Sequence, residues 1–358
     1  MGDAVKRLDR YVFGGFAVAF ASTLVLVLAL YLVLDAFQRL DDYVDYARRD
    51  GVFTAVGVAL RYYSLRFLAE MSVFSEIVAV IPAVLVVAGM ARANEFVAPL
   101  AAGRSLRRLA APVFAGCALV GVMAFALQNV AGPALVRQAF ADRRRITGRA
   151  AALGNSLSVQ GRSGSAAVAL SVERYDSGAR RAEGFQACVI ESKEGAPLVD
   201  IRAPVAEWDG ASRAWRFPEG ARRWAYGSSV AGDAVKTIDR FPTVLGPDLL
   251  EAEELGARVL GLGALFRQRP RPEFASAFHR RLAQMLAPLA LALAAVPFVL
   301  TTDRSRIFHA GVLAALVTVG YEVAARSFAA YLPPLLGGWL APVGFTALGA
   351  WRLKTMDT

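Results

Sequence analysis

Residues 11–34 form an unbroken apolar run without a single charged side chain. A helix of about 20 mostly apolar residues crosses the hydrocarbon core of a bilayer, so this run predicts a membrane span. It is too long for the apolar region of a signal peptide and lacks a small-x-small cleavage site at its end. Comparable runs follow at 71–91, 109–130, 282–300, 310–331 and 333–352. We therefore expect an α-helical integral membrane protein with six transmembrane helices, three on each side of a long polar segment.

That polar segment shows the alternation of apolar and polar residues that is typical of β-strands. The alternating stretches are 156–160, 166–172, 186–191, 197–208 and 214–217. Turn signals such as Asp209-Gly210 and Glu219-Gly220 separate them, and 249–265 has the pattern of a helix. This spacing predicts an all-β sandwich or an open barrel. We expect transmembrane helices 1–3 in 1–130, the inserted β domain with flanking helical segments in 131–279, and transmembrane helices 4–6 in 280–358.

Positive charge at the ends of the runs predicts the orientation, because Lys and Arg collect on cytoplasmic loops. Basic residues precede the first run, separate the second from the third, and follow the sixth; Arg304 and Arg306 separate the fourth from the fifth. The loop 332–338 carries no charge. Both termini are therefore expected to be cytoplasmic in the inner membrane, with 131–279 periplasmic. The net charge of +10 then reflects topology and anionic lipid, and we expect no nucleic acid partner.

Several kinds of site chemistry are missing from the sequence. None of the four lysines follows a glycine, so there is no Walker A loop to hold a nucleotide. The two histidines, His279 and His309, fall at opposite membrane faces in the six-span arrangement. No His, Cys and carboxylate residues share metal-ligand spacing. We expect no cofactor, no metal and no catalytic residue, and hence not an enzyme.

Charged residues within or beside the spans are candidates for function. Glu322 and Arg326 lie four residues apart in the fifth run, on one helix face, and charges at such depth face protein or water. Arg326 could bind a lipid phosphate with Glu322 holding it, or the two could form an internal ion pair that only packs one subunit against another. Four arginines after the third run suit a phosphorylated lipid, although a solvated basic face is an equal alternative; they are Arg137, Arg143, Arg144 and Arg145.

The predicted cytoplasmic loop 92–108 begins with Asn94-Glu95, continues with a short apolar stretch, and reaches Gly103 and Ser105 before a basic cluster. A short helix of this composition could lie at the membrane surface and dock into a cytosolic partner. The alternative is a loop that merely follows the positive-inside rule.

The run from Glu95 to Ser105 resembles the E-(L/I)-x-x-x-x-A-x-G-x-(S/T) signature of the LptF/LptG permeases of lipopolysaccharide export. Further motifs of that family occur in the same order, so that the resemblance covers essentially the whole chain. They are Leu8-Asp9-Arg10-Tyr11 before the first span, Asn129-Val130-Ala131-Gly132-Pro133 after the third, Ala206-Glu207-Trp208 with Ala214-Trp215-Arg216-Phe217, Ala287-Pro288-Leu289, Val296-Pro297-Phe298 and Arg304. The opening motif slightly favours the LptG type.

The resemblance implies the permease subunit of an ABC exporter that passes lipopolysaccharide, or a similar anionic glycolipid, from the inner membrane to a periplasmic bridge. It implies a jellyroll-like β domain and four kinds of partner: an LptB-like cytosolic ATPase dimer, a related six-span subunit, a single-span LptC-like bridge protein and the lipid. Loop 92–108 would be the coupling helix, and the residues that it would present to the ATPase are Arg92, Glu95, Gly103, Arg104 and Ser105.

Two positions depart from the family pattern. Pro99 lies inside the expected coupling helix, where it could kink the helix or delay its start. Asp35, a candidate on the lipid path, stands where some members carry a basic residue. Two other functions compete with the permease: a non-transporting scaffold or sensor whose β domain binds a partner, and a membrane-embedded transferase.

Overall fold

The computed structural model describes residues 2–147, 152–153, 157–163, 166–176, 178–191, 198–226, 236–300 and 307–355. The chain divides into two compact units. The helical unit comprises Met1–Asp41, Tyr63–Leu135 and Gly261–Thr358, and the β unit comprises Asp42–Tyr62 and Val136–Leu260. Arg304 and Arg306, on which part of the predicted orientation depends, lie outside the described residues.

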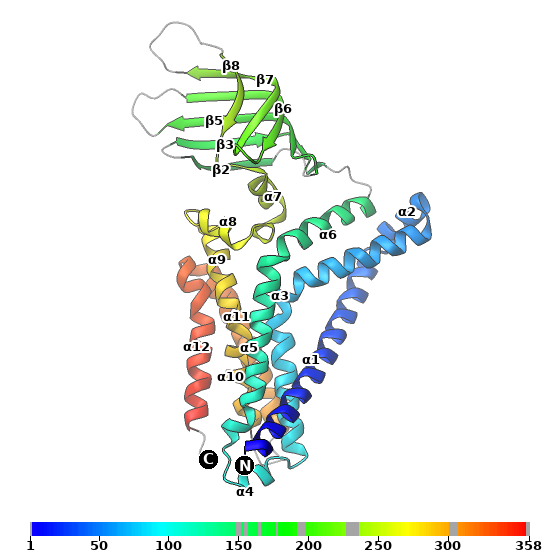
Figure 1. The fold of residues 1–358 in the computed structure, drawn as a ribbon, viewed down its shortest axis with the longest axis vertical. Coiled ribbons are helices and arrows are strands. Elements are labelled where there is room, and N and C mark those ends of the chain that lie inside the picture. The colour runs from blue at the N-terminus through cyan, green and yellow to red at the C-terminus, as the bar shows by residue number, and fades with distance from the viewer. Residues whose placement is uncertain are drawn as a thin grey trace. The chain divides into compact units, whose positions relative to one another are not determined.

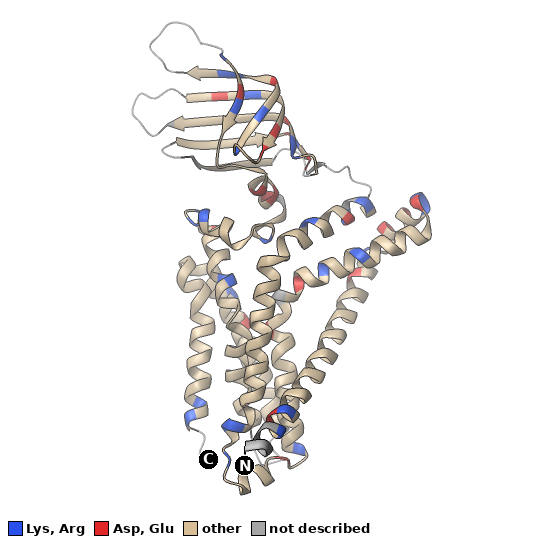
Figure 2. Ribbon diagram, in the orientation of Figure 1, with Lys and Arg blue, Asp and Glu red and all other residues tan. Residues whose placement is uncertain are grey.

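The helical unit is built mainly from long helices (Figure 1). Its helices are α1 (Gly2–Gln38), the larger part of α3 (Val52–Arg92), the short α4 (Val97–Ala101), α5 (Leu106–Val130), the short α8 (Leu262–Arg267), α9 (Pro272–Gln284), α10 (Ala287–Val299), α11 (Ile307–Tyr331) and α12 (Pro334–Thr355). In Figure 2 the long helices are largely free of charge along their middles, and Lys and Arg gather at the end that carries α4 and both chain termini.

Among the described residues, four helices are long and apolar enough to cross a membrane: Arg7–Gln38, Phe74–Arg92, Leu106–Val130 and Phe308–Tyr331. The expected span 282–300 is not one straight helix, because α9 and α10 meet at a bend of 52° and only together reach spanning length. The structure thus supports four or five apolar spans where the sequence predicts six. Helix α12 coincides with the sixth run, but its glycines and prolines lower its mean hydropathy. That α12 crosses the membrane stays a prediction.

Helix α10 lies at the centre of the helical unit, and most of its side chains are buried. It contacts α5, α9, α11 and α12. Small residues allow helix backbones to approach closely in a membrane. At Gly349 of α12, a Cβ atom would overlap with the backbone of Leu293 in α10, and at Gly121 of α5 it would overlap with the carbonyl of Met285. These two glycines set how closely α12 and α5 pack on this region.

The β unit begins with a helical part made of α2 (Leu40–Asp50), the first turns of α3, and α6 (Gly132–Thr147). Arg49 Nη2 donates to the carbonyl of Ile146 at 3.0 Å. Arg61 Nε lies 3.0 Å from Asp142 Oδ2, whose side chain is only 1% exposed. The segment 42–62 is therefore fastened to α6. Residues 52–70, which carry Arg61, Arg66 and Glu70, continue into the second span as one helix.

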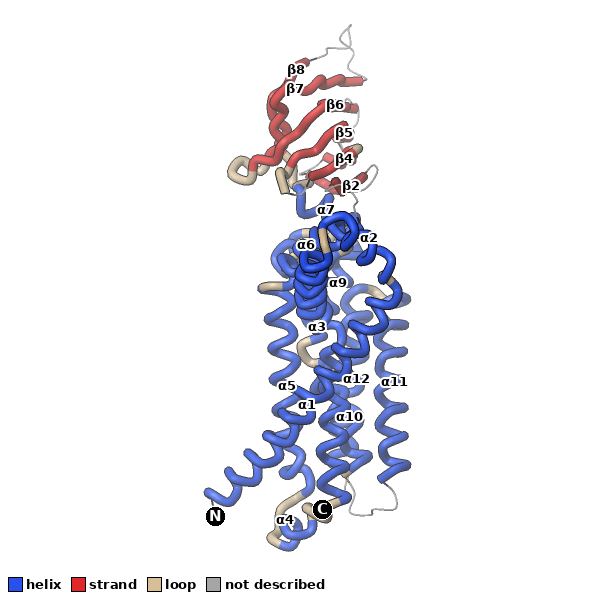
Figure 3. Tube along the Cα trace, turned by 90° about the vertical axis from the view of Figure 1, so that its right-hand side faces the viewer, coloured by secondary structure: helices blue, strands red, loops and turns tan. Residues whose placement is uncertain are grey.

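All described strands form one antiparallel sheet, curved in Figure 3. The strands are β1 (Ala152–Leu153), β2 (Leu157–Ser163), β3 (Ala166–Val172), β4 (Arg174–Asp176), β5 (Arg181–Glu191), β6 (Leu198–Asp209), β7 (Ala214–Tyr226) and β8 (Lys236–Pro242). β3 and β4 pair with successive parts of one edge of β5, and β6, β7 and β8 follow at the other edge. The inserted antiparallel β domain is confirmed; β5 to β8 follow one another as a meander, whereas β1 pairs with β4 and β3 with β5.

An aromatic core closes one face of the sheet. Trp215 is fully buried and packs against the rings of Phe185, Tyr175 and Trp208. Its indole Nε1 donates to the carbonyl of Leu245 at 3.0 Å, which satisfies the one polar atom of a buried ring. The segment that follows, expected to be one helix over 249–265, is broken into α7 (Pro247–Leu255), the 3₁₀ turn Ala257–Val259 and α8, because Gly256 adopts a left-handed φ of +75°.

Candidate functional site

The loop between α3 and α5 is ordered by one buried side chain. Phe96 is 1% exposed and packs in the same core as Val12 and Phe16 of α1. Gly103 has φ of +76°, a conformation that other residues adopt only with strain. The expected coupling helix is only the single turn α4. Of the two effects expected of Pro99, a kink or a late start, the structure shows a helix that begins only at Val97, with Pro99 in its first turn, where a missing N–H leaves no helix bond unmade.

The predicted coupling residues surround this turn. Arg92 ends α3 and is exposed, while Glu95, Arg104 and Ser105 are partly buried. Tyr11 Oη donates to Glu95 Oε1 at 3.0 Å.

Two other contacts hold the far end of the loop. Arg108 Nη2 lies 2.7 Å from Asp9 Oδ2, and Arg107 Nη2 donates to the carbonyl of Lys354 at 2.9 Å. The sequence predicts the loop but not these partners from α1 and α12. The Leu8–Tyr11 motif is the one signal that marks Asp9 and Tyr11.

Asp35 near the end of α1 is 8% exposed and is paired with two arginines. Arg39 Nε lies 3.0 Å from Asp35 Oδ1, and Arg66 Nη1 of α3 lies 3.4 Å from the same oxygen. The guanidinium of Arg66 also covers the ring of Tyr31 at 5.5 Å. Arg39 and Arg66 therefore supply positive charge beside Asp35. The sequence alone does not mark these two arginines as site residues.

Glu322 and Arg326 of α11 lie close together, as their spacing predicts. Arg326 Nη2 is 3.4 Å from Glu322 Oε2, and the arginine side chain is 82% exposed whereas Glu322 is 24% exposed. The carboxylate of Glu76 in α3 accepts a hydrogen bond from the hydroxyl of Tyr321. The charged side chains of Glu322, Arg326 and Arg280 interact electrostatically with the same carboxylate. Three helices (α3, α9 and α11) therefore share one polar cluster among apolar surroundings.

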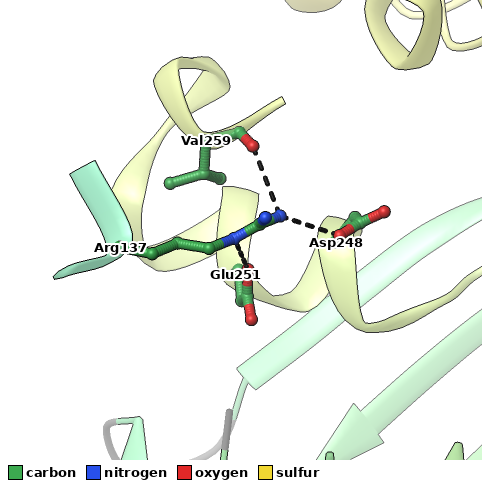
Figure 4. Close-up of polar contacts among 4 residues, drawn as sticks. All are labelled: Arg137, Asp248, Glu251 and Val259. Atoms are coloured by element: carbon green, nitrogen blue, oxygen red, sulfur yellow. Dashed lines mark hydrogen bonds and ion pairs between the residues drawn. The ribbon is translucent and has the colours of Figure 1, made fainter. Parts of the chain in front are cut away.

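Arg137 of α6 is held by acceptors of its own unit (Figure 4). Its Nε lies 2.6 Å from Glu251 Oε2, and its Nη2 lies 2.8 Å from Asp248 Oδ1 and 3.4 Å from the carbonyl of Val259. Glu251 is buried, and burial raises the pKa of its carboxyl, an effect that Arg137 opposes. Arg137 thus fastens α6 to α7 and to the turn after it.

The other arginines of α6 differ from Arg137. Arg143 and Arg145 are exposed, and among the described residues neither has an ion-pair partner. Arg144 is helical, but its side chain lies outside the described part of the chain. The sequence groups these residues with Arg137, whereas the structure separates one engaged arginine from two solvent-facing ones.

No three His, Cys, Asp or Glu side chains gather as a metal site in the described ranges. The described residues form a set of apolar spans, a loop held at one end of the helical unit, a polar cluster inside that unit, and an inserted sheet. This combination defines a multi-pass membrane protein with an inserted antiparallel β domain.

Comparison with family models identifies the family. The model of the lipopolysaccharide export system permease LptF/LptG matches residues 10–355. The chain belongs to this family and is a permease subunit of the ABC transporter that exports lipopolysaccharide; it is not itself an ATPase. A comparison with curated proteins finds no match.

Proposed function

We propose that this permease works as one of a pair of related six-span subunits, with both termini cytoplasmic, and that a dimeric ABC-type ATPase binds loop 92–108. The pair takes lipopolysaccharide from the inner membrane and passes it through the β domains to a single-span bridge protein. One observation carries the proposal: the loop is anchored by buried Phe96, and next to it the carboxylate of Glu95 reaches the surface at the end that holds both termini.

The loop has the features that a coupling element needs. An anchored loop transmits displacement, whereas a loop held only by its two ends absorbs it. Arg92 and Glu95 offer one cation and one anion for pairing with charges on a cytosolic protein. Gly103 gives the chain the reversal that returns it to α5.

The lipid path, in this proposal, uses the arginines that the protein leaves exposed. Arg326, Arg143 and Arg145 are placed to bind phosphate through paired N–H donors. Asp35 does not contact the lipid phosphate directly, because like charges repel; it holds Arg39 and Arg66, which supply the positive charge near the end of the first span. Arg137 has a structural role, since carboxylates already occupy its Nε and Nη2 donors.

The test is a complex of this chain, its related subunit and the ATPase in proteoliposomes. Glu95→Gln keeps the shape of the side chain and removes its charge. Removal of a charged interaction of this kind is expected to lower ATPase stimulation by roughly tenfold or more. Gly103→Ala should also weaken coupling, because an alanine at φ of +76° is strained. Glu253→Gln, an exposed acid of α7, serves as the control.

If Glu95→Gln and Gly103→Ala stimulate the ATPase as the wild-type chain does, the loop is not the coupling element. If the chain does not assemble with any ATPase, the scaffold or sensor function gains support.

A further inference from the structure

Helix α1 touches the loop through a hydrogen bond that the sequence does not suggest. Tyr11 Oη donates to Glu95 Oε1 at 3.0 Å, although the two residues are 84 positions apart. Among the described residues, no other side chain hydrogen-bonds this carboxylate. Tyr11 is 61% exposed within this chain and begins the first predicted span, so the pair lies at the expected cytoplasmic edge of the membrane, beside the loop proposed to bind the ATPase. The tyrosine therefore restricts the rotamers of Glu95 through one oxygen and leaves the other for a partner's cation.

A second contact ties the same turn of α1 to the other end of the loop. Asp9 lies two residues before Tyr11, and its carboxylate is 2.7 Å from Arg108 in the first turn of α5. Between these contacts, Phe96 packs with Val12 and Phe16. The opening turns of α1 thus bridge the start and the end of the loop, and we call these two polar contacts the α1 bridge.

Beyond its opening turns, α1 is held sparsely along its middle and is fastened to α3 near its far end, where Asp35 pairs with Arg66. Only 6% of its most apolar stretch is buried within this chain, and α5 is the principal helix that it contacts. A helix with little packing along its middle can tilt as a rigid body when its opening turns are displaced. The contacts at Asp9, Tyr11, Val12 and Phe16 give a displacement of the loop a direct path to the first span.

We propose that Tyr11 is a positioning residue for Glu95, and that the α1 bridge transmits ATPase-driven movement of the loop to α1. This inference rests on the proposed coupling function of the loop. Tyr11 presents the Glu95 carboxylate in one orientation to a cationic side chain of the ATPase. The Asp9–Arg108 pair keeps the base of α1 moving with the loop.

The test compares Tyr11→Phe, Glu95→Gln and the double variant in the complete proteoliposome complex, with Tyr331→Phe as a matched loss of an exposed hydroxyl on α11. Tyr11→Phe is expected to lower the lipopolysaccharide released per ATP by about three- to tenfold, the range of one hydrogen bond. The KM for ATP should not change. The double variant should lose no more than Glu95→Gln alone, because the hydroxyl acts through that carboxylate.

The outcomes separate the two claims. If Glu95→Gln has no effect, the coupling function of the loop fails. If Glu95→Gln uncouples while Tyr11→Phe behaves like Tyr331→Phe, or if the two losses multiply, only the role of Tyr11 is overturned.

A charge exchange tests the bridge even if Tyr11→Phe does not accumulate in the membrane. Asp9→Arg and Arg108→Asp should each reduce release per ATP, and the double exchange should restore it. Failure of the double exchange to restore coupling would overturn the bridge.

Discussion

Arg137 Nε lies 2.6 Å from Glu251 Oε2, and this pair joins the helix that follows the third span to the helix that follows the sheet. The glutamate is 8% exposed and the arginine 39% exposed. Removing one partner of such a pair costs more than the pair itself contributes, because it leaves a buried charge without compensation. The pair therefore contributes to the stability of the β unit independently of any lipid binding.

Arg137→Ala is expected to destabilise the β unit by about 2 kcal/mol, since the partial exposure of Arg137 lets water replace some of the lost contact. Arg48→Ala is the control, because the Arg48–Asp45 pair is exposed and 3.8 Å long and should change nothing measurable. Limited proteolysis of the two detergent-solubilised variants at increasing temperature measures how far each variant destabilises the β unit. Equal protection of the two variants would contradict the structural role of Arg137.

The raised pKa of Glu251 predicts a pH dependence with a definite sign. Its folded-state pKa lies above its unfolded value, so the folded state holds the proton more tightly. The stability that this supplies is present at low pH and is lost as the pH rises through the folded pKa. Glu251→Gln should remove this slope, measured as the difference in unfolding midpoint between wild type and variant from about pH 4 to 7.

Asp209 supplies the opposite slope. Hydrogen bonds from the Ser212 hydroxyl and from the backbone N–H of Ala211 lower the pKa of the Asp209 carboxyl. Its contribution to folding stability is therefore lost as the pH falls. Asp209→Asn is therefore the sign control. The interpretation of Glu251 is wrong if both variants change the slope in the same direction.

Gly349 sets the distance between α12 and α10. Gly349→Ala places a Cβ against the backbone of Leu293, and such overpacking is expected to cost about 1–3 kcal/mol. Gly344→Ala, in the same helix with open space around it, should be neutral or slightly stabilising because alanine favours helix. Thermal aggregation of the purified protein compares the two. Equal midpoints would mean that α12 does not pack on α10 as described.

The sequence predicts much of the fold because long apolar runs and strand alternation are local signals. It misses the bend between α9 and α10, since the apolar run 282–300 begins in the last turn of α9 and gives no signal of a change in helix direction. Glu219-Gly220 has the composition of a turn, yet it lies within β7 at an irregularity where the register shifts between Arg216 and Ala221. A glycine with φ of +72° serves a bulge as well as a turn, and only pairing with neighbouring strands distinguishes them.

The candidate site is predicted less completely than the fold. Spacing alone places Glu322 beside Arg326, because they are one helical turn apart. Spacing carries no information on Tyr11 and Glu95 or on Arg137 and Glu251, which distant segments bring together. The identity of a charged residue is local, whereas its partner is set by tertiary packing.

Cysteine labelling tests the proposed orientation and the crossing of α12. In a background with Cys117→Ser and Cys188→Ser, Leu335→Cys and Ala179→Cys should react with a membrane-impermeant maleimide added to intact spheroplasts. Thr355→Cys should react only after permeabilisation, because α12 returns the chain to the cytoplasm. Labelling of Thr355→Cys from outside would contradict six spans with cytoplasmic termini.

The central claim is that this chain moves lipopolysaccharide with a partner's ATP hydrolysis, and transport itself is the measurement that tests it. Proteoliposomes that contain the chain, its related subunit, the ATPase and lipopolysaccharide are mixed with a soluble lipopolysaccharide-binding acceptor, and transfer to the acceptor is followed with and without ATP. We predict ATP-dependent transfer that is lost when this chain is omitted and that falls with Glu95→Gln. Transfer that continues without the chain, or vigorous ATP hydrolysis by the complete complex with no transfer, would contradict the account.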